Sequence, residues 1–212
     1  YTVSSDALND ATLRPTLIAL GLDPYSGEGR STVVAVAVDA QHTTVPDLLD
    51  ARRGVLLTLH AETAARVLGG DAAYQEVTAE TRAYLPVGRR LVVAGKGRAG
   101  WIGTHDDPET SVPFFKRYFL GGATGLRGWS RFDVAPLSPD GLPIGGYTFL
   151  ETSGEARLDL DDRRAFGLVG FVDAGNVWGQ TWKLPDLGDL RVDVGGGVRF
   201  GTTAAVPGRP GG

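Results

Sequence analysis

Polar and apolar residues alternate along most of this chain, in segments long enough to be β-strands. A period of two places successive side chains on opposite faces of a sheet. In residues 54–63, for example, Val55 and Leu59 fall on one face, while Thr58 and Glu62 fall on the other. We therefore predict an all-β, antiparallel protein. The predicted strands are 32–39, 54–63, 74–85, 89–101, 147–160, 166–177 and 190–200, and an eighth segment, 11–20, fits either a short strand or a helical turn.

A sandwich of two sheets and a closed barrel both produce this alternation, but three features favour the barrel. The segments are longer than the ~5–6 residues typical of strands in globular proteins, and their polar faces carry charges of both signs. Short connections (86–88 and 161–164) occur beside a very long one (102–146), as in outer-membrane barrels. Trp101 and Trp178 end strands on the long-loop side, where an aromatic girdle would lie. Scattered surface tryptophans are the alternative, and Trp182 fits that description.

Composition narrows the picture further. The chain has 212 residues, of which 42% are hydrophobic and 22% charged, so disorder is not expected. No apolar run approaches the ~20 residues of a membrane helix, whereas a barrel strand needs only ~9–11 residues with every second one apolar. The absence of cysteine excludes disulfides and thiolate chemistry in this chain. A net charge of -4 gives no electrostatic basis for binding nucleic acid.

Candidate catalytic and metal-binding patterns are weak. Gly95, Gly97 and Gly100 match the dinucleotide fingerprint as text, but no helix signal follows, so small residues on a strand face are the better interpretation. The three histidines show no ligand spacing, and no serine or threonine lies in a nucleophile elbow. The carboxylate pairs Glu76/Glu80 and Glu151/Glu155 fit a self-neutralising polar lumen better than a glycosidase. We expect no enzyme, no metal site and no cofactor.

Arg127 offers a more specific constellation with Glu155 and Asp173. Alternation places these two carboxylates on the polar faces of neighbouring strands, and Arg127 lies in a glycine-rich part of the long connection. If that connection folds back onto the polar face, the guanidinium can bind both acids through charge-assisted hydrogen bonds. Spacing alone leaves a second interpretation open, in which Arg127 is a solvated loop residue.

Several motifs around this constellation resemble those of the Omp85 superfamily of outer-membrane barrels. FLGG at 119–122 followed by LRGW at 126–129 resembles the signature of the family's sixth loop. Downstream lie GG at 145–146 with GEAR at 154–157, FVDAG at 171–175, and GGGVR at 195–199 with Thr202 and Thr203. A looser match, Asp39 with Pro46, Arg53 and Gly54, precedes them, although His42 and Thr43 replace the family's Arg-Asp pair.

The resemblance implies a transmembrane β-barrel in the bacterial outer membrane, with the long loop entering its lumen. It implies that the loop is locked by Arg127 against lumen partners. The loop residues concerned are Gly121, Gly122, Leu126, Arg127, Gly128 and Trp129; the lumen partners are Glu155, Arg157, Phe171, Asp173 and Gly175.

The same resemblance sets expectations for domains and function. The chain, 1–212, would be one partial barrel domain of about eight strands with a loop-six-like insertion at 103–145. The family's POTRA domains and last strands would lie outside it, so we expect that this piece alone does not insert into a membrane. The implied function is an assembly factor of the BamA/TamA kind, which acts without catalysis on unfolded outer-membrane or secreted client proteins, in the lipid bilayer and with periplasmic or accessory subunits. A two-partner secretion pore is the alternative, and a passive porin is a third.

Overall fold

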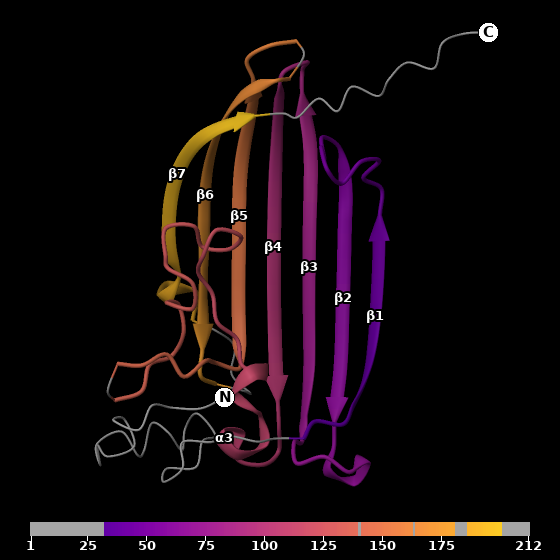
Figure 1. Ribbon diagram of the computed structural model, residues 1–212, viewed down its shortest axis with the longest axis vertical. Coiled ribbons are helices and arrows are strands. Elements are labelled where there is room, and N and C mark those ends of the chain that lie inside the picture. Colours follow the sequence, from indigo (N-terminus) through magenta and orange to yellow (C-terminus); the bar gives the residue numbers. More distant parts are fainter. Residues whose placement is uncertain (1–31, 140, 163, 181–185, 201–212) are drawn as a thin grey trace, which may run out of the picture.

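A single antiparallel sheet dominates the computed structural model, which describes residues 32–139, 141–162, 164–180 and 186–200. Its seven strands lie side by side in sequence order, each paired with the next along the chain (Figure 1). The strands are β1 (Ala35–Thr43), β2 (Gly54–Ala64), β3 (Tyr74–Val87), β4 (Leu91–Gly103), β5 (Thr148–Asp159), β6 (Phe166–Trp178) and β7 (Arg191–Phe200).

The seven predicted strands match these elements, with corrections at several ends. The fourth strand, predicted as 89–101, is 91–103, so the long loop begins at residue 104 and not at 102 or 103. Residues 40–43, predicted as part of a connection, extend β1 because they pair with 56–59 of β2. Pro86, predicted in a turn, belongs to β3. On the side of β2, the pairing of β3 ends at Tyr84. Pro86 lies beyond this point, so its lack of an N–H group does not break a hydrogen bond to β2. The predicted segment 11–20, Trp182 and the glycine- and proline-rich tail lie outside the described residues.

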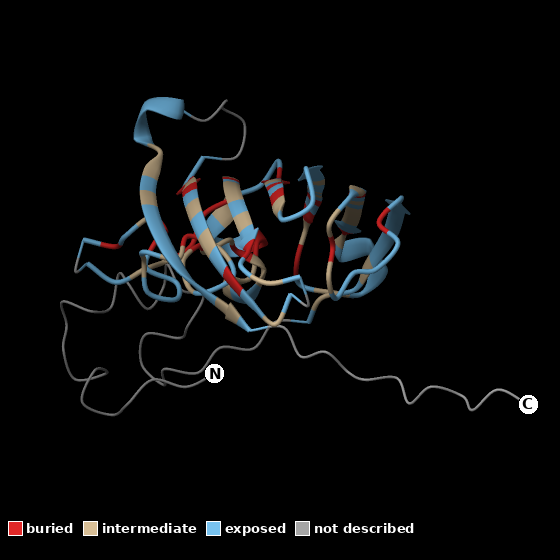
Figure 2. Ribbon diagram, turned by 90° about the horizontal axis from the view of Figure 1, so that it is seen from above, coloured by how far each residue is buried: buried red, intermediate tan, exposed pale blue. Residues whose placement is uncertain are grey.

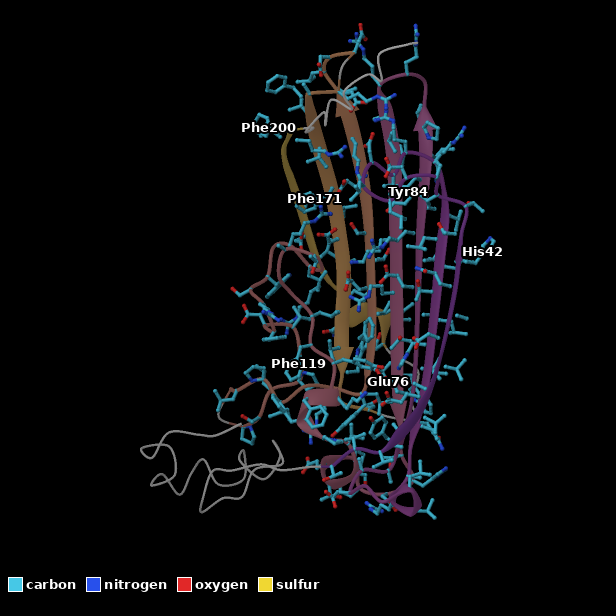
Figure 3. The ribbon with its side chains drawn as sticks, turned by 45° about the vertical axis from the view of Figure 1, so that its right-hand side comes forward. His42, Glu76, Tyr84, Phe119, Phe171 and Phe200 are labelled. Carbon is cyan, nitrogen blue, oxygen red and sulfur yellow. The ribbon has the colours of Figure 1, made fainter. Side chains whose placement is uncertain are left out.

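The two faces of the sheet differ completely in charge. On the strands, the apolar face carries no Asp, Glu, Lys or Arg, and many of its large side chains are exposed, Val38 by 67% and Val194 by 77%. The opposite face carries every Asp, Glu, Lys and Arg of the seven strands. Figure 2 looks along the strands and shows a curved, open wall rather than a closed cylinder. In Figure 3 His42 projects away on the apolar side, whereas Glu76 lies on the side of the long loop.

The longest connection of the sheet lies at one end of the strands. The long loop, residues 104–147, joins β4 to β5 and contains α3 (Pro108–Ser111) and the 3-10 turn η2 (Phe114–Lys116). Isolated bridges then fold the chain back on itself, Tyr118 with Gly146 and Leu120 with Val134. We call residues 107–118 the root of the loop and residues 120–134 its tip. At the same end, 3-10 turns η1 (Arg66–Leu68) and η3 (Leu187–Asp189) occupy the other two connections.

The long loop takes part in two of the hydrophobic clusters on this sheet, and a third, around Val45, Ala51 and Leu56, forms without it. One cluster lies under the root and joins Val112 and Tyr147 to Tyr74 and Ile102 of the strands. A second lies under the tip and joins Leu126 and other loop residues to Phe149 and Val177. Among the described residues, no helix has the length and apolar character needed to cross a membrane.

Candidate functional site: the long loop against the polar face

The tip is a tight turn that its glycines make possible. Gly121 and Gly122 adopt φ angles of +106° and +96°, which side chains strongly disfavour. A Cβ on Gly121 would also lie 2.2 Å from the carbonyl oxygen of Ser130. The amide of Gly122 donates to the carbonyl of Trp129 at 2.9 Å, which closes the turn. The turn presents residues 126–128 to the sheet.

Arg127 is bound to the sheet by five hydrogen bonds. Its Nε and Nη2 atoms donate to the two carboxylate oxygens of Asp173, each at 2.7 Å. Nη1 donates to Glu155 at 2.8 Å and Nη2 also donates to the hydroxyl of Ser153 at 3.0 Å. The backbone amide of Arg127 adds a contact to Asp173 at 3.3 Å. The structure thus brings the predicted arginine and both predicted acids together, from the tip, β5 and β6.

The surroundings of Arg127 favour its charged form. The hydrogen bonds that Arg127 donates to Asp173, with the one it donates to Glu155, raise the pKa of Arg127 further above its ordinary value, and burial opposes this only in part. The guanidinium carbon lies 3.4 Å from the ring centroid of Phe171, so a cation–π interaction also stabilises the charge. Asp173 is fully buried, so its carboxylate depends on Arg127 and Ser153 for compensation. The site is therefore an ion-pair network built around one fully buried carboxylate, with Arg127 and Glu155 partly exposed.

The other predicted loop residues surround this network. Leu126 is fully buried in the hydrophobic cluster under the tip, and Trp129 packs against the same cluster. The ring of Trp129 also lies under the guanidinium of Arg191, 4.7 Å away. Gly128 passes close to β7, where an added Cβ would lie 2.7 Å from the Cβ of Asp193. A side chain at Gly128 would therefore push the tip away from the sheet.

The remaining predicted lumen residues take indirect positions. Arg157 does not contact Arg127 but donates to Glu155 at 2.5 Å, so Glu155 is shared by two arginines. Gly175 faces the loop, and a Cβ there would lie 3.3 Å from Leu120 and closer still to the backbone of β5. Its lack of a side chain lets the tip approach the sheet.

The structure adds contacts that the sequence did not predict. Glu151 is buried, with 1% exposure, and pairs with Lys96 and Arg98 of β4. Lys96 also donates to the carbonyl of Thr124 in the tip at 2.8 Å. Alternation had placed these residues on one face, but only the β4–β5 register shows that Arg98 lies directly opposite Glu151.

Beneath the root, a second unpredicted group holds the loop. Arg117 has 5% exposure and donates to three backbone carbonyls, those of Glu109, Val112 and Ile144, at 3.1–3.4 Å. The Tyr118 hydroxyl donates to Glu76 at 3.0 Å, and burial, together with the nearby Glu76, raises the pKa of Tyr118. The helical turn α3 is capped by Asp107, which accepts from the amide of Glu109. No recognisable motif marks these residues in the sequence.

The described residues contain no cluster of side chains suited to bind a metal ion. No group of three or more His, Asp or Glu residues there is arranged to hold a metal ion. Several acids of the polar face pair with arginine or lysine, as Glu155 and Glu151 do. What this arrangement can do is hold a loop firmly against a sheet.

Comparison with protein families gives one extensive match. The model of the Omp85 superfamily domain matches residues 19–206, which include every residue of the Arg127 network.

Individual relatives agree with this match. The chain is 28% identical over 153 residues to the outer membrane protein assembly factor BamA of Nitratidesulfovibrio vulgaris, covering 70% of this chain and 19% of that protein. It is 27% identical over 138 residues to BamA of Neisseria meningitidis, covering 61% of this chain and 17% of that protein. The chain thus spans less than a fifth of the length of these two relatives.

A solved structure gives the corresponding result for the fold. The crystal structure of BamA from Haemophilus ducreyi lacking POTRA domains 1–3 matches 94% of this chain and 42% of its own, with a TM-score of 0.69 and 19% sequence identity. This likeness confirms the predicted fold class, an antiparallel sheet that forms part of a barrel.

Proposed function

The chain belongs to the Omp85 superfamily, and we propose that it is part of the barrel wall of an outer-membrane protein assembly factor, with its tip locked inside by Arg127. Its location is the bacterial outer membrane. The observation that carries the proposal is the Arg127 network, because it holds the tip on the polar face at the motif that resembles the family's loop signature. The two BamA relatives supply the class of activity.

The apolar face supports placement in lipid. It carries no Asp, Glu, Lys or Arg across the described strands, and so large an exposed apolar face would be unfavourable in water. Aromatic residues mark both ends of β6, Phe166 at one end and Trp178 at the other. At ~3.3 Å per residue and the ~40° tilt of barrel strands, the span between them is roughly 30 Å along the membrane normal, the thickness of the hydrocarbon core.

The polar face then lines a lumen that the long loop partly fills. A porin keeps an open aqueous channel, whereas here the tip packs against β5 and β6 through both Arg127 and a hydrophobic cluster. This arrangement favours a barrel whose wall works on client proteins over a passive pore. The edges β1 and β7 of the described sheet need further strands as partners, because unpaired backbone groups are unfavourable in lipid.

The proposed work needs no covalent chemistry. Unfolded outer-membrane clients would meet the barrel from the periplasm, with periplasmic or accessory subunits, and insert beside its wall. A firmly held tip would keep the wall in one curvature during this process. A secretion pore of the same superfamily would use the same barrel wall and the same Arg127 network. The two functions therefore differ in the client protein, which is inserted into the membrane in one case and exported in the other.

A complementation experiment in the native host tests the proposal. The full gene product is depleted and replaced by Arg127→Ala or, as control, by Arg131→Ala, which removes an exposed tip arginine that lies over Phe132. We expect Arg127→Ala to lower the amount of folded, heat-modifiable client barrels several-fold, and Arg131→Ala to match the parent. If instead depletion stops export of one secreted passenger and leaves other outer-membrane proteins intact, the secretion pore is correct. Full client assembly with Arg127→Ala would reject the lock.

A further inference from the structure

Two carboxylates face each other on β2 and β3, away from the Arg127 network. Glu62 and Glu76 are direct partners in the β2–β3 register, and their side chains are only 11% and 10% exposed. Like charges directly opposite on one face of a sheet repel, and the repulsion grows as water is excluded. The pair therefore requires a cation.

The long loop supplies that cation from its root. Nζ of Lys116 lies 2.6 Å from Glu62 and 3.8 Å from Glu76. Two tyrosines complete the set, since Tyr74 donates to Glu62 at 2.5 Å and Tyr118 donates to Glu76 at 3.0 Å. His60 also faces Glu62, at 3.9 Å, but its closer partner is Asp39 at 2.8 Å. Lys116 is thus the cation in closest contact with both carboxylates.

We propose that Lys116, bound between Glu62 and Glu76, is a second anchor of the long loop, which holds the root on β2 and β3 independently of Arg127. The two anchors contact different strands, because Arg127 binds β5 and β6. Between the two anchors in the sequence lie Gly121 and Gly122 of the tip, whose left-handed backbone turns the chain. The loop is therefore attached to the sheet at two separate places, on β2 and β3 and on β5 and β6. This inference goes beyond the proposed function and does not depend on the client.

The chain offers a matched pair of reporters for this proposal. Val112 in the root and Val134 in the tip are both 0% exposed, and the chain contains no cysteine. Val112→Cys and Val134→Cys are therefore introduced separately into the full protein in its native membrane, and the rate of maleimide labelling is measured. The parent protein without either cysteine gives the background.

Independent anchors predict opposite results for the two reporters. Lys116→Met should raise the labelling rate at position 112 about tenfold and leave position 134 unchanged, and Arg127→Met should do the reverse. Lys116→Arg should keep the slow rate at position 112, since a guanidinium can also bridge the carboxylates. An unchanged rate at position 112 in Lys116→Met, or equal increases at both positions, would overturn the proposal.

A second variant separates anchoring from simple charge compensation. Lys116→Met is combined with Glu62→Gln and Glu76→Gln, which removes the repulsion and lets the protein fold even where Lys116→Met alone does not. If Lys116 is an anchor, position 112 still labels quickly in this triple variant. If labelling returns to the slow parental rate, Lys116 only neutralises the carboxylates, and the root is held by other contacts.

Discussion

The tip and the root of the long loop both lie on the polar face, but they are held in different ways. The tip has a hydrophobic cluster and a hydrogen bond from Lys96, but its main polar contact is Arg127, whose partners are side chains of two strands. The root is held by several groups, among them Arg117, which donates to backbone carbonyls, and a hydrophobic cluster that includes Val112. A hydrogen bond to a backbone carbonyl survives substitution of the accepting residue, whereas a hydrogen bond to a side-chain carboxylate does not. The tip should therefore be the more fragile part.

The largest expected effect comes from Arg127→Met. The substitution leaves the fully buried Asp173 without its cation, which should lower the free energy of unfolding by on the order of 3–5 kcal/mol. Arg131→Met removes an exposed tip arginine and should change stability by less than about 0.5 kcal/mol. Urea unfolding of the folded protein in lipid vesicles measures both. Equal stability of the two variants would show that the tip does not depend on Arg127.

A smaller effect is expected where the tip passes β7. Gly128→Ala places a Cβ 2.7 Å from that of Asp193, and such overpacking should cost about 1–3 kcal/mol. Adding Asp193→Gly removes the obstructing atom and should restore most of the loss, which makes the two changes strongly non-additive. Gly95→Ala is a suitable control, because nothing lies within 4 Å of a Cβ at that position. Additive effects in the double variant would place the cost of Gly128→Ala elsewhere.

The smallest effect is expected in the root. Tyr118→Phe removes the hydrogen bond to Glu76 and should cost about 1 kcal/mol near neutral pH, because Arg117 and the hydrophobic cluster remain.

The same variant carries a pH dependence with a defined sign. The pKa of Tyr118 is raised by burial and by Glu76, so the folded protein keeps this phenol protonated where the unfolded chain ionises. Its contribution to stability is complete below the ordinary pKa of about 10 and declines as the pH rises above it. Above that pH, the unfolding free energy of the parent should fall more steeply than that of Tyr118→Phe. Parallel curves would mean that Tyr118 ionises normally.

Local patterns determined a large part of this molecule. The period of two along each strand assigns every side chain to one face, so the seven strands and the sides of Glu155 and Asp173 could be predicted without coordinates. The glycines at 121, 122 and 128 and the motif around Arg127 marked the tip. The period of two depends only on neighbouring residues in the sequence. The glycines are informative because glycine adopts backbone conformations that other residues disfavour.

Tertiary structure alone decided what lies opposite what. Alternation predicts that Glu62 and Glu76 lie on polar faces of their strands, but only the register makes them a pair, and only the path of the loop brings Lys116 between them. The same holds for Asp193, which lies across from Asp173 and against Gly128. The physical reason is that an irregular loop has no period. The positions that its side chains reach depend on backbone turns and buried contacts from distant segments, which no local pattern encodes.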